Sequence, residues 1–189
     1  KQYDPLRRRA EIIRALRAGG SLEDFKNSIR KWIKTHTNVD PDNYSGYYPN
    51  KTYDVEITDE LYININNGKD LVLTGDDLGS VESFISFNKL SGNLTVGGNR
   101  YLTQLPGCFL GAKVAKDFIC INMPSLKTLM GAPLKVGGNY ILTGCKNLET
   151  LDGAPMSTDD FSGVFMSDTR FSNEDFYETI ENGGLMKDS

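Results

Sequence analysis

His36 is the only histidine in this chain of 189 residues, so catalysis that needs an imidazole would have to use it. The sequence around it contains no motif that pairs it with a serine or cysteine nucleophile, as a hydrolytic triad requires. The three cysteines, Cys108, Cys120 and Cys145, do not have the spacing of metal ligands. We therefore expect no enzymatic activity, no metal and no cofactor.

Paired carboxylates and paired glycines are the remaining candidates for chemistry. Asp76–Asp77 and Asp159–Asp160 fall on expected turns, where acidic residues exposed to solvent are common. Gly97–Gly98 and Gly137–Gly138 do not open a helix or precede a Lys-Ser/Thr pair, as a phosphate-binding loop would. The glycine pairs instead recur as corners of a longer sequence repeat.

That repeat is clearest in Val114–Pro133 and Val136–Pro155, which begin 22 residues apart. Counted from Asn139, leucines follow at offsets of nine and twelve and a glycine at fourteen. Copies of the unit, with degenerate ones at both ends, open at spacings of 23, 24, 22 and 21 residues, at Asp70, Asn93, Asp117, Asn139 and Asp160. This period is typical of leucine-rich repeats. We expect the opening Asn and Asp side chains to hydrogen-bond local backbone at a bend.

Each repeat is predicted to begin with a strand whose alternate side chains line one core. The inward positions are Leu71, Leu73, Leu94, Val96, Phe118, Cys120, Tyr140 and Leu142. The opposite face carries a strip of mostly β-branched residues that are candidates for protein binding: Val72, Thr74, Thr95, Ile119, Ile121, Ile141 and Thr143. An exposed strip of this kind marks an interaction site. The alternatives are that N-terminal segments cover it, or that the two faces are swapped.

Residues 1–36 predict two helices, the first opened by Asp4 and the second by Ser21. This segment carries a net charge of +6, whereas the rest of the chain carries −10. A basic helical pair can bind nucleic acid, and the candidate residues are Arg7, Arg8, Arg9, Arg14, Arg17, Arg30 and Lys31. The alternative is a basic cap docked on the acidic repeats, or an ordinary solvated face.

The expected fold is α+β: a short leucine-rich-repeat-like β-solenoid of about four to five coils with helical caps. Its parts are a basic helical hairpin, a linker or tyrosine-rich loop, the repeat solenoid, and a C-terminal capping helix with a tail, at residues 1–36, 37–53, 54–172 and 173–189. In the loop, Tyr44, Tyr47 and Tyr48 could form a contact surface. We expect them to pack over the first coil instead.

The units GNYILTGCKNLETLDGAPMST and, in part, KDFICINMPSLKTLMGAPLKV carry a resemblance. They look like the leucine-rich-repeat-like proteins that many tailed bacteriophages encode, over about residues 69–172. The resemblance implies a phage origin and a binding role, and it supplies no catalytic residues.

These observations together predict a non-enzymatic protein that binds a host or virion protein, for example as an inhibitor of a host defence or transcription enzyme. Unlinked cysteines indicate a reducing compartment such as the host cytoplasm, and no apolar run approaches the ~18 residues of a membrane span. Two alternatives remain open: nucleic-acid binding through residues 1–36, and a structural virion component that assembles with itself.

Overall fold

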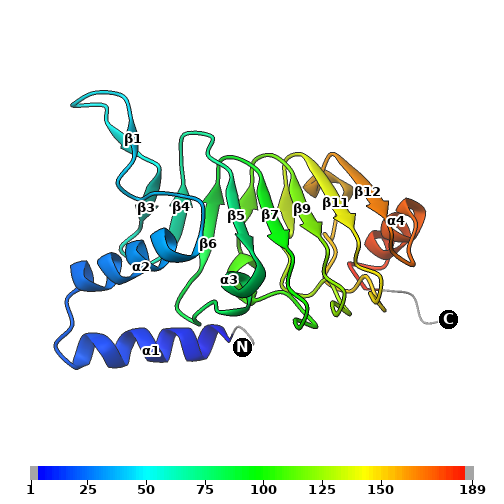
Figure 1. Ribbon diagram of the computed structural model, residues 1–189, viewed down its shortest axis with the longest axis horizontal. Helices are drawn as coiled ribbons and strands as arrows, with labels where there is room; N and C mark the ends of the chain where they lie inside the picture. Colours follow the sequence, from blue (N-terminus) through cyan, green and yellow to red (C-terminus); the bar gives the residue numbers. More distant parts are fainter. Residues whose placement is uncertain (1–3, 186–189) are drawn as a thin grey trace.

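The computed structural model describes residues 4–185. The predictions made for residues 1–3 and 186–189, as the ends of the N-terminal hairpin and of the C-terminal tail, lie outside this range. The repeats that open at Asp70, Asn93 and Asp117 each contribute one strand to each of two five-stranded β-sheets, and the strands of each sheet follow one another along the long axis of the molecule (Figure 1).

The first sheet, here sheet I, has the strand order β12-β11-β9-β7-β5, and all of its pairs are parallel. Its strands are β5 (Leu71–Thr74), β7 (Leu94–Gly97), β9 (Phe118–Ile121), β11 (Asn139–Thr143) and β12 (Gly163–Ser167). Sheet II has the order β10-β8-β6-β4-β3, with β3 and β4 antiparallel and the other pairs parallel. Its strands are β3 (Val55–Ile57), β4 (Ile63–Ile65), β6 (Phe87–Leu90), β8 (Lys113–Val114) and β10 (Lys135–Val136).

The prediction of an α+β, leucine-rich-repeat-like β-solenoid is wrong. The described residues form a mixed α/β fold with four α-helices and two sheets rich in parallel pairs, and it is not a closed solenoid. The difference arises because the repeats that open at Asp70, Asn93 and Asp117 each contribute a second strand, to sheet II. Strands as short as Lys113–Val114 and Lys135–Val136 have too few residues to show alternation in the sequence.

The core lies between the two sheets, and the predicted inward positions all point into it. Every one of the eight residues is fully buried: Leu71, Leu73, Leu94, Val96, Phe118, Cys120, Tyr140 and Leu142. The leucines of the Leu-x-x-Leu steps at Leu126, Leu129, Leu148 and Leu151 are fully buried as well. The alternation of strand side chains therefore identified the core correctly, although the architecture around it was not foreseen.

The Asn and Asp residues that open the repeats form a ladder between repeats rather than local turns. The Oδ1 atom of Asp70 accepts from the N–H of Asn93 at 2.8 Å, and that of Asn93 from the N–H of Asp117 at 2.9 Å. Asp117 continues the series to the N–H of Asn139 at 2.7 Å. The expectation that these side chains bond local backbone at a bend was therefore wrong, because each one accepts a hydrogen bond from a backbone N–H of the next repeat.

Replacing Asp117 with alanine is expected to cost about 1–2 kcal/mol of unfolding free energy, because the N–H of Asn139 loses its acceptor. Replacing Asp117 with asparagine keeps an acceptor oxygen, as Asn93 shows one step earlier in the ladder, and should change stability by less than about 0.5 kcal/mol. Urea unfolding followed by circular dichroism measures both values. Equal losses in the two variants would contradict the role given to the ladder.

The last repeat opens at a different residue from the one predicted. In the register of sheet I, Gly163 lies opposite Asn139, so Asp160 does not belong to the ladder. Asp160 instead ends a short 3₁₀ helix, η2 (Thr158–Asp160). A second 3₁₀ helix, η1 (Gly107–Phe109), lies in the repeat that opens at Asn93.

The α-helices gather mainly at the two ends of the molecule (Figure 1). They are α1 (Pro5–Arg17), α2 (Leu22–His36), the short α3 (Gly75–Gly79) and α4 (Asn173–Glu181). Asp4 caps α1 and Ser21 caps α2, as the sequence predicted, and Ser172 with Asp175 forms a capping box on α4. Trp32 belongs to the core.

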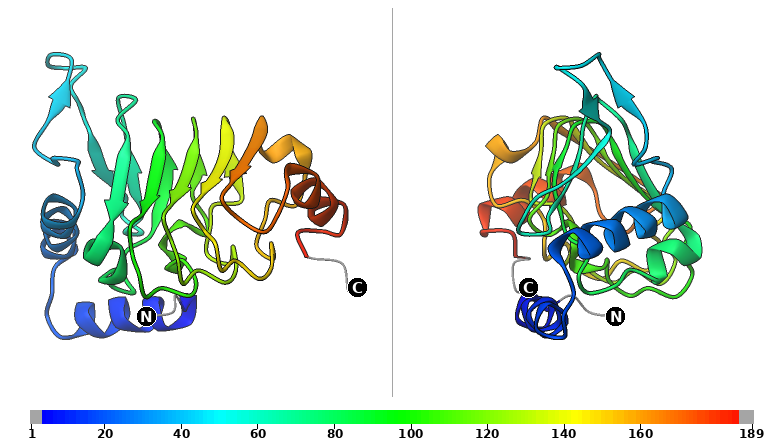
Figure 2. Two further views of the ribbon diagram at one scale, coloured as in Figure 1. Left: turned by 45° about the vertical axis from the view of Figure 1, so that its right-hand side comes forward. Right: turned by 90° about the vertical axis from the view of Figure 1, so that its left-hand side faces the viewer.

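Helices α1 and α2 do not form the expected hairpin of adjacent helices. In the right-hand view of Figure 2, α1 is seen end-on while α2 runs across the picture, so the two helices cross. Within residues 4–185, none of the helices is both long and apolar enough to cross a lipid bilayer.

Candidate binding surfaces

The outer face of sheet I presents two columns of side chains that run across all five strands. Parallel register aligns the first column as Val72, Thr95, Ile119, Ile141 and Phe165, and the second as Thr74, Gly97, Ile121, Thr143 and Ser167. Strands are spaced about 4.8 Å apart, so each column is about 19 Å long. The structure thus brings all seven predicted protein-binding residues together on one surface.

Side chains on this face are exposed or half-buried, whereas their inward-facing strand neighbours are buried, except for the half-buried Met166. The two faces of the strands were therefore assigned correctly. Half-burial of Val72, Ile119 and Ile141 follows from the register, because each side chain packs against its counterpart on the adjacent strand.

An asparagine side chain binds the backbone of each edge strand of sheet I. At β5, Asn38 accepts from the N–H of Val72 at 2.7 Å and donates to the carbonyl of Asp70 at 2.9 Å. At β12, Asn173 accepts from the N–H of Met166 at 3.0 Å. Unpaired strand edges invite pairing with another chain. The bonds from Asn38 and Asn173 disfavour such pairing at the edges of sheet I, so we expect a partner to bind its outer face.

Phe165 is the residue of this surface that sequence reasoning missed. It extends the first column onto β12 and is 58% exposed, the most exposed aromatic side chain on the sheet. The degenerate last repeat concealed it, because counting from Asp160 shifts the strand register. The alternation in Val164, Phe165 and Met166 was the available signal.

A second surface is the hairpin of β1 (Tyr44–Ser45) and β2 (Thr52–Tyr53), which projects from the end of the molecule (Figures 1 and 2). Tyr47 and Tyr48 at its tip are 90% and 92% exposed. The expectation that this loop packs over the first repeat was wrong. Exposed tyrosines provide a large, amphipathic contact area, so the projecting tip is a second candidate surface.

The stem of the hairpin is held by a cation and by side chains from the body. Lys51 Nζ lies 3.8 Å from the ring centre of Tyr44 and 4.7 Å from that of Tyr53. A hydrogen bond to Tyr53 raises the pKa of Lys51. Asn66 Nδ2 donates to the carbonyl of Tyr53 at 3.0 Å, and Asn67 Nδ2 to that of Thr52 at 3.0 Å. These contacts orient the tip relative to the sheets.

The basic residues predicted to bind nucleic acid do not form one free surface. Arg8 is buried, its Nη2 donates to the carbonyl of Leu61 at 2.9 Å, and its guanidinium lies 4.8 Å from the ring centre of Tyr62. It attaches α1 to the body and is not available to a ligand. Arg7 pairs with Glu11 at 3.2 Å.

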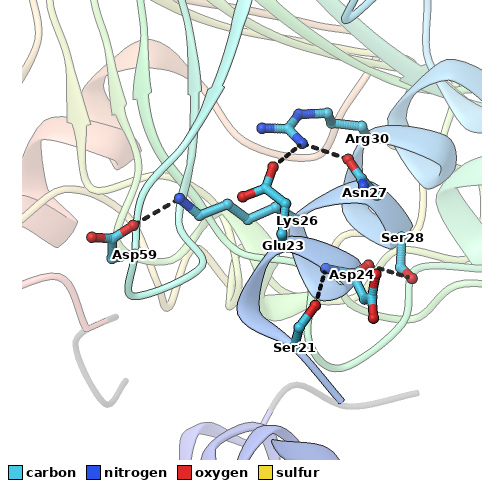
Figure 3. Close-up of polar contacts among 8 residues, drawn as sticks. All are labelled: Ser21, Glu23, Asp24, Lys26, Asn27, Ser28, Arg30 and Asp59. Atoms are coloured by element: carbon cyan, nitrogen blue, oxygen red, sulfur yellow. Dashed lines mark hydrogen bonds and ion pairs between the residues drawn. The ribbon is translucent and has the colours of Figure 1, made fainter.

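On α2, several basic side chains also have partners nearby (Figure 3). Arg30 Nη1 donates to Asn27 at 2.6 Å and pairs with Glu23 at 3.2 Å, while Lys26 reaches Asp59 at 2.7 Å. The predicted residues that stay exposed on the surface are Arg7, which pairs with Glu11, and Arg9, Arg14, Arg17 and Lys31. The sequence could not distinguish these exposed residues from the buried Arg8, because the partners of Arg8, Leu61 and Tyr62, lie far along the chain.

The titratable groups considered for catalysis are dispersed. His36 Nδ1 lies 2.8 Å from Asp77 Oδ1, which links α2 to α3, and its ring lies 5.0 Å from that of Trp32. Cys120 and Cys145 are buried with their sulfur atoms 4.0 Å apart, and Cys108 is buried elsewhere in the core. Burial raises the pKa of the Cys108 thiol, and hydrogen bonding to Cys145 raises that of Cys120.

The part of the chain that the structure describes contains no cluster of three or more histidine, cysteine or carboxylate side chains placed to hold a metal ion. Comparison of the chain with family models, with curated proteins and with solved structures found no match.

Proposed function

We propose that this protein is a non-enzymatic binding module of phage origin that acts on a host protein in the host cytoplasm. The observation that carries the proposal is the outer face of sheet I. Its two aligned columns carry exposed and half-buried side chains, the first column ends in the exposed Phe165, and an asparagine side chain binds the backbone of each edge strand. Inhibition of a defence or transcription enzyme is a function that such a face could perform.

The β1–β2 hairpin, with Tyr47 and Tyr48 at its tip, is a second observation that supports the same proposal. Binding energy at protein interfaces is concentrated in a few aromatic anchors. Tyr47 and Tyr48 are presented at a projecting tip, and Phe165 lies at the far edge of sheet I. A protein partner broad enough to contact both ends of the molecule would engage an aromatic anchor at each.

Replacing Ile119 and Ile141 together with lysine is expected to abolish capture of the protein partner. The two side chains are adjacent at the centre of the first column, and two cations there would be desolvated by any apolar contact surface. The measurement is affinity capture of the intact protein from a nuclease-treated bacterial lysate, followed by mass spectrometry. One stoichiometric host protein should be retained by the wild type and lost from the double variant.

A matched control places the same charges on exposed apolar residues outside sheet I. Leu110 and Met130 are 39% and 46% exposed, and their double lysine variant should retain the partner. Circular dichroism must show that both variants are folded. The proposal fails if both variants capture the same protein equally well. Capture of nucleic acid alone, lost on reversing Arg9, Arg14 and Arg17 to glutamate, would favour the basic helix instead.

A further inference from the structure

Three lysines are aligned on the outer face of sheet II. In the register of the parallel strands, Lys89 on β6 lies opposite Lys113 on β8, which lies opposite Lys135 on β10. All three side chains are exposed. With strands about 4.8 Å apart, the lysine column spans about 10 Å.

This arrangement has an electrostatic cost that no ion pair within residues 4–185 relieves. Like charges placed directly opposite each other on neighbouring strands destabilise a sheet. Among residues 4–185, ion pairs engage Lys26, Lys34, Lys127 and Lys146, but none engages the three lysines of the column. An acidic protein with a net charge of −4 has therefore concentrated unpaired positive charge in one place.

The ends of the column are marked by acidic residues. Beyond Lys89, β4 contributes Asn64, whose Nδ2 donates to Glu56 on β3 at 3.0 Å. Beyond Lys135 the sheet ends, and Asp159 and Asp160 of the acidic turn line the same groove as Lys113 and Lys135. Carboxylates on both sides would repel an anion longer than the column.

We propose that the lysine column of Lys89, Lys113 and Lys135 binds a short linear anion that carries two or three phosphate groups. Lysine binds phosphate as a point charge, and the column supplies three such charges in a line. Phosphate groups bring more negative charge within about 10 Å than single carboxylates do. The column lies on the face opposite to that of the protein-binding strip, so this inference does not depend on the proposed function.

The experiment is isothermal titration of the full chain with sodium tripolyphosphate at low ionic strength and pH 7. Stoichiometric binding that weakens with added salt is expected. Replacing all three lysines with glutamine should weaken binding about tenfold or more, since each exposed ion pair is worth up to about fivefold in a binding constant. Replacing Asp159 and Asp160 with asparagine should strengthen binding about twofold, because it removes the flanking negative charge.

The control variant removes the same charge from scattered positions, by replacing Lys69, Lys127 and Lys146 with glutamine. Its affinity should fall much less than that of the column variant, because these lysines lie outside the column and act on the anion only through longer-range electrostatics. Absence of binding by the wild type, or equal weakening in both triple variants, overturns the proposal. Equal affinity for citrate would refute the preference for phosphate. Tighter binding of single-stranded DNA through the same lysines would overturn the proposal, because the ligand would then be a nucleic acid and not a short anion.

Discussion

Replacing Gly153 with alanine is expected to destabilise the protein by about 3 kcal/mol or more. Gly153 has a φ of +97°, and a Cβ there would lie 2.5 Å from the carbonyl carbon of Leu129 and 2.6 Å from the backbone nitrogen of Met130. A left-handed backbone costs an alanine about 1–2 kcal/mol, and forcing an atom into a packed contact costs about 1–3 kcal/mol more. Backbone atoms cannot rotate away as a side-chain tip can.

Urea unfolding gives the comparison, with Gly111→Ala as the matched control. Nothing lies within 4 Å of a Cβ at Gly111, and its φ is outside the left-handed region, so its change should stay within about 0.5 kcal/mol. Gly131, with a φ of +92° and Leu105 O at 2.5 Å, should behave like Gly153. A loss below about 1 kcal/mol at both positions would show that the repeats are not in close backbone contact there.

The glycines explain why the repeat could be found in the sequence. Gly131 lies against Leu105 of the preceding repeat, and Gly153 against Leu129, so stacking imposes the same residue at the same offset. The buried leucines are imposed in the same way, because each repeat completes the core of its neighbour. Constraints that act once in every repeat leave a periodic signal in the sequence. The recurring glycines and buried leucines were therefore predictable.

Sheet II left a much shorter signal, a lysine and an apolar residue that recur at 89–90, 113–114 and 135–136. Its strands β8 and β10 contain two residues each, and hydrogen bonds to neighbouring repeats, not side-chain alternation, define them. A leucine-rich repeat and this two-sheet arrangement share a period and a set of buried leucines. The sequence pattern therefore predicted the stacking and the core, and it assigned them to the wrong architecture.

The candidate surfaces also differ in how far the sequence predicted them. The strip on sheet I was predictable because strand alternation places it opposite the buried column. The burial of Arg8 was not predictable, because its acceptor is the carbonyl of Leu61, 53 residues away. The lysine column was equally hidden, since it depends on the register of strands that the sequence did not reveal.

Replacing Tyr140 should change stability in opposite directions, depending on what replaces it. Tyr140 is fully buried between Phe118 and Phe176, with ring centres at 4.8 and 5.0 Å. Alanine should cost about 3–5 kcal/mol, because it leaves a cavity where β11 meets the C-terminal helix. Phenylalanine should stabilise by about 1 kcal/mol, since within the described residues the Tyr140 hydroxyl has no hydrogen-bond partner.

The pH dependence of unfolding distinguishes this explanation from simple repacking. Burial raises the pKa of the Tyr140 hydroxyl well above its ordinary value of 10.0, so the folded protein keeps a proton that the unfolded chain loses. Wild-type stability should therefore be unaffected by this group below about pH 10 and should fall as the pH rises above it. The stability advantage of Tyr140→Phe should widen over that range in urea unfolding measured from pH 7 to 11. The cysteines are common to both proteins and cancel in the difference. An advantage that is constant with pH, or a phenylalanine variant less stable than wild type at pH 7, would mean that the hydroxyl is satisfied in solution.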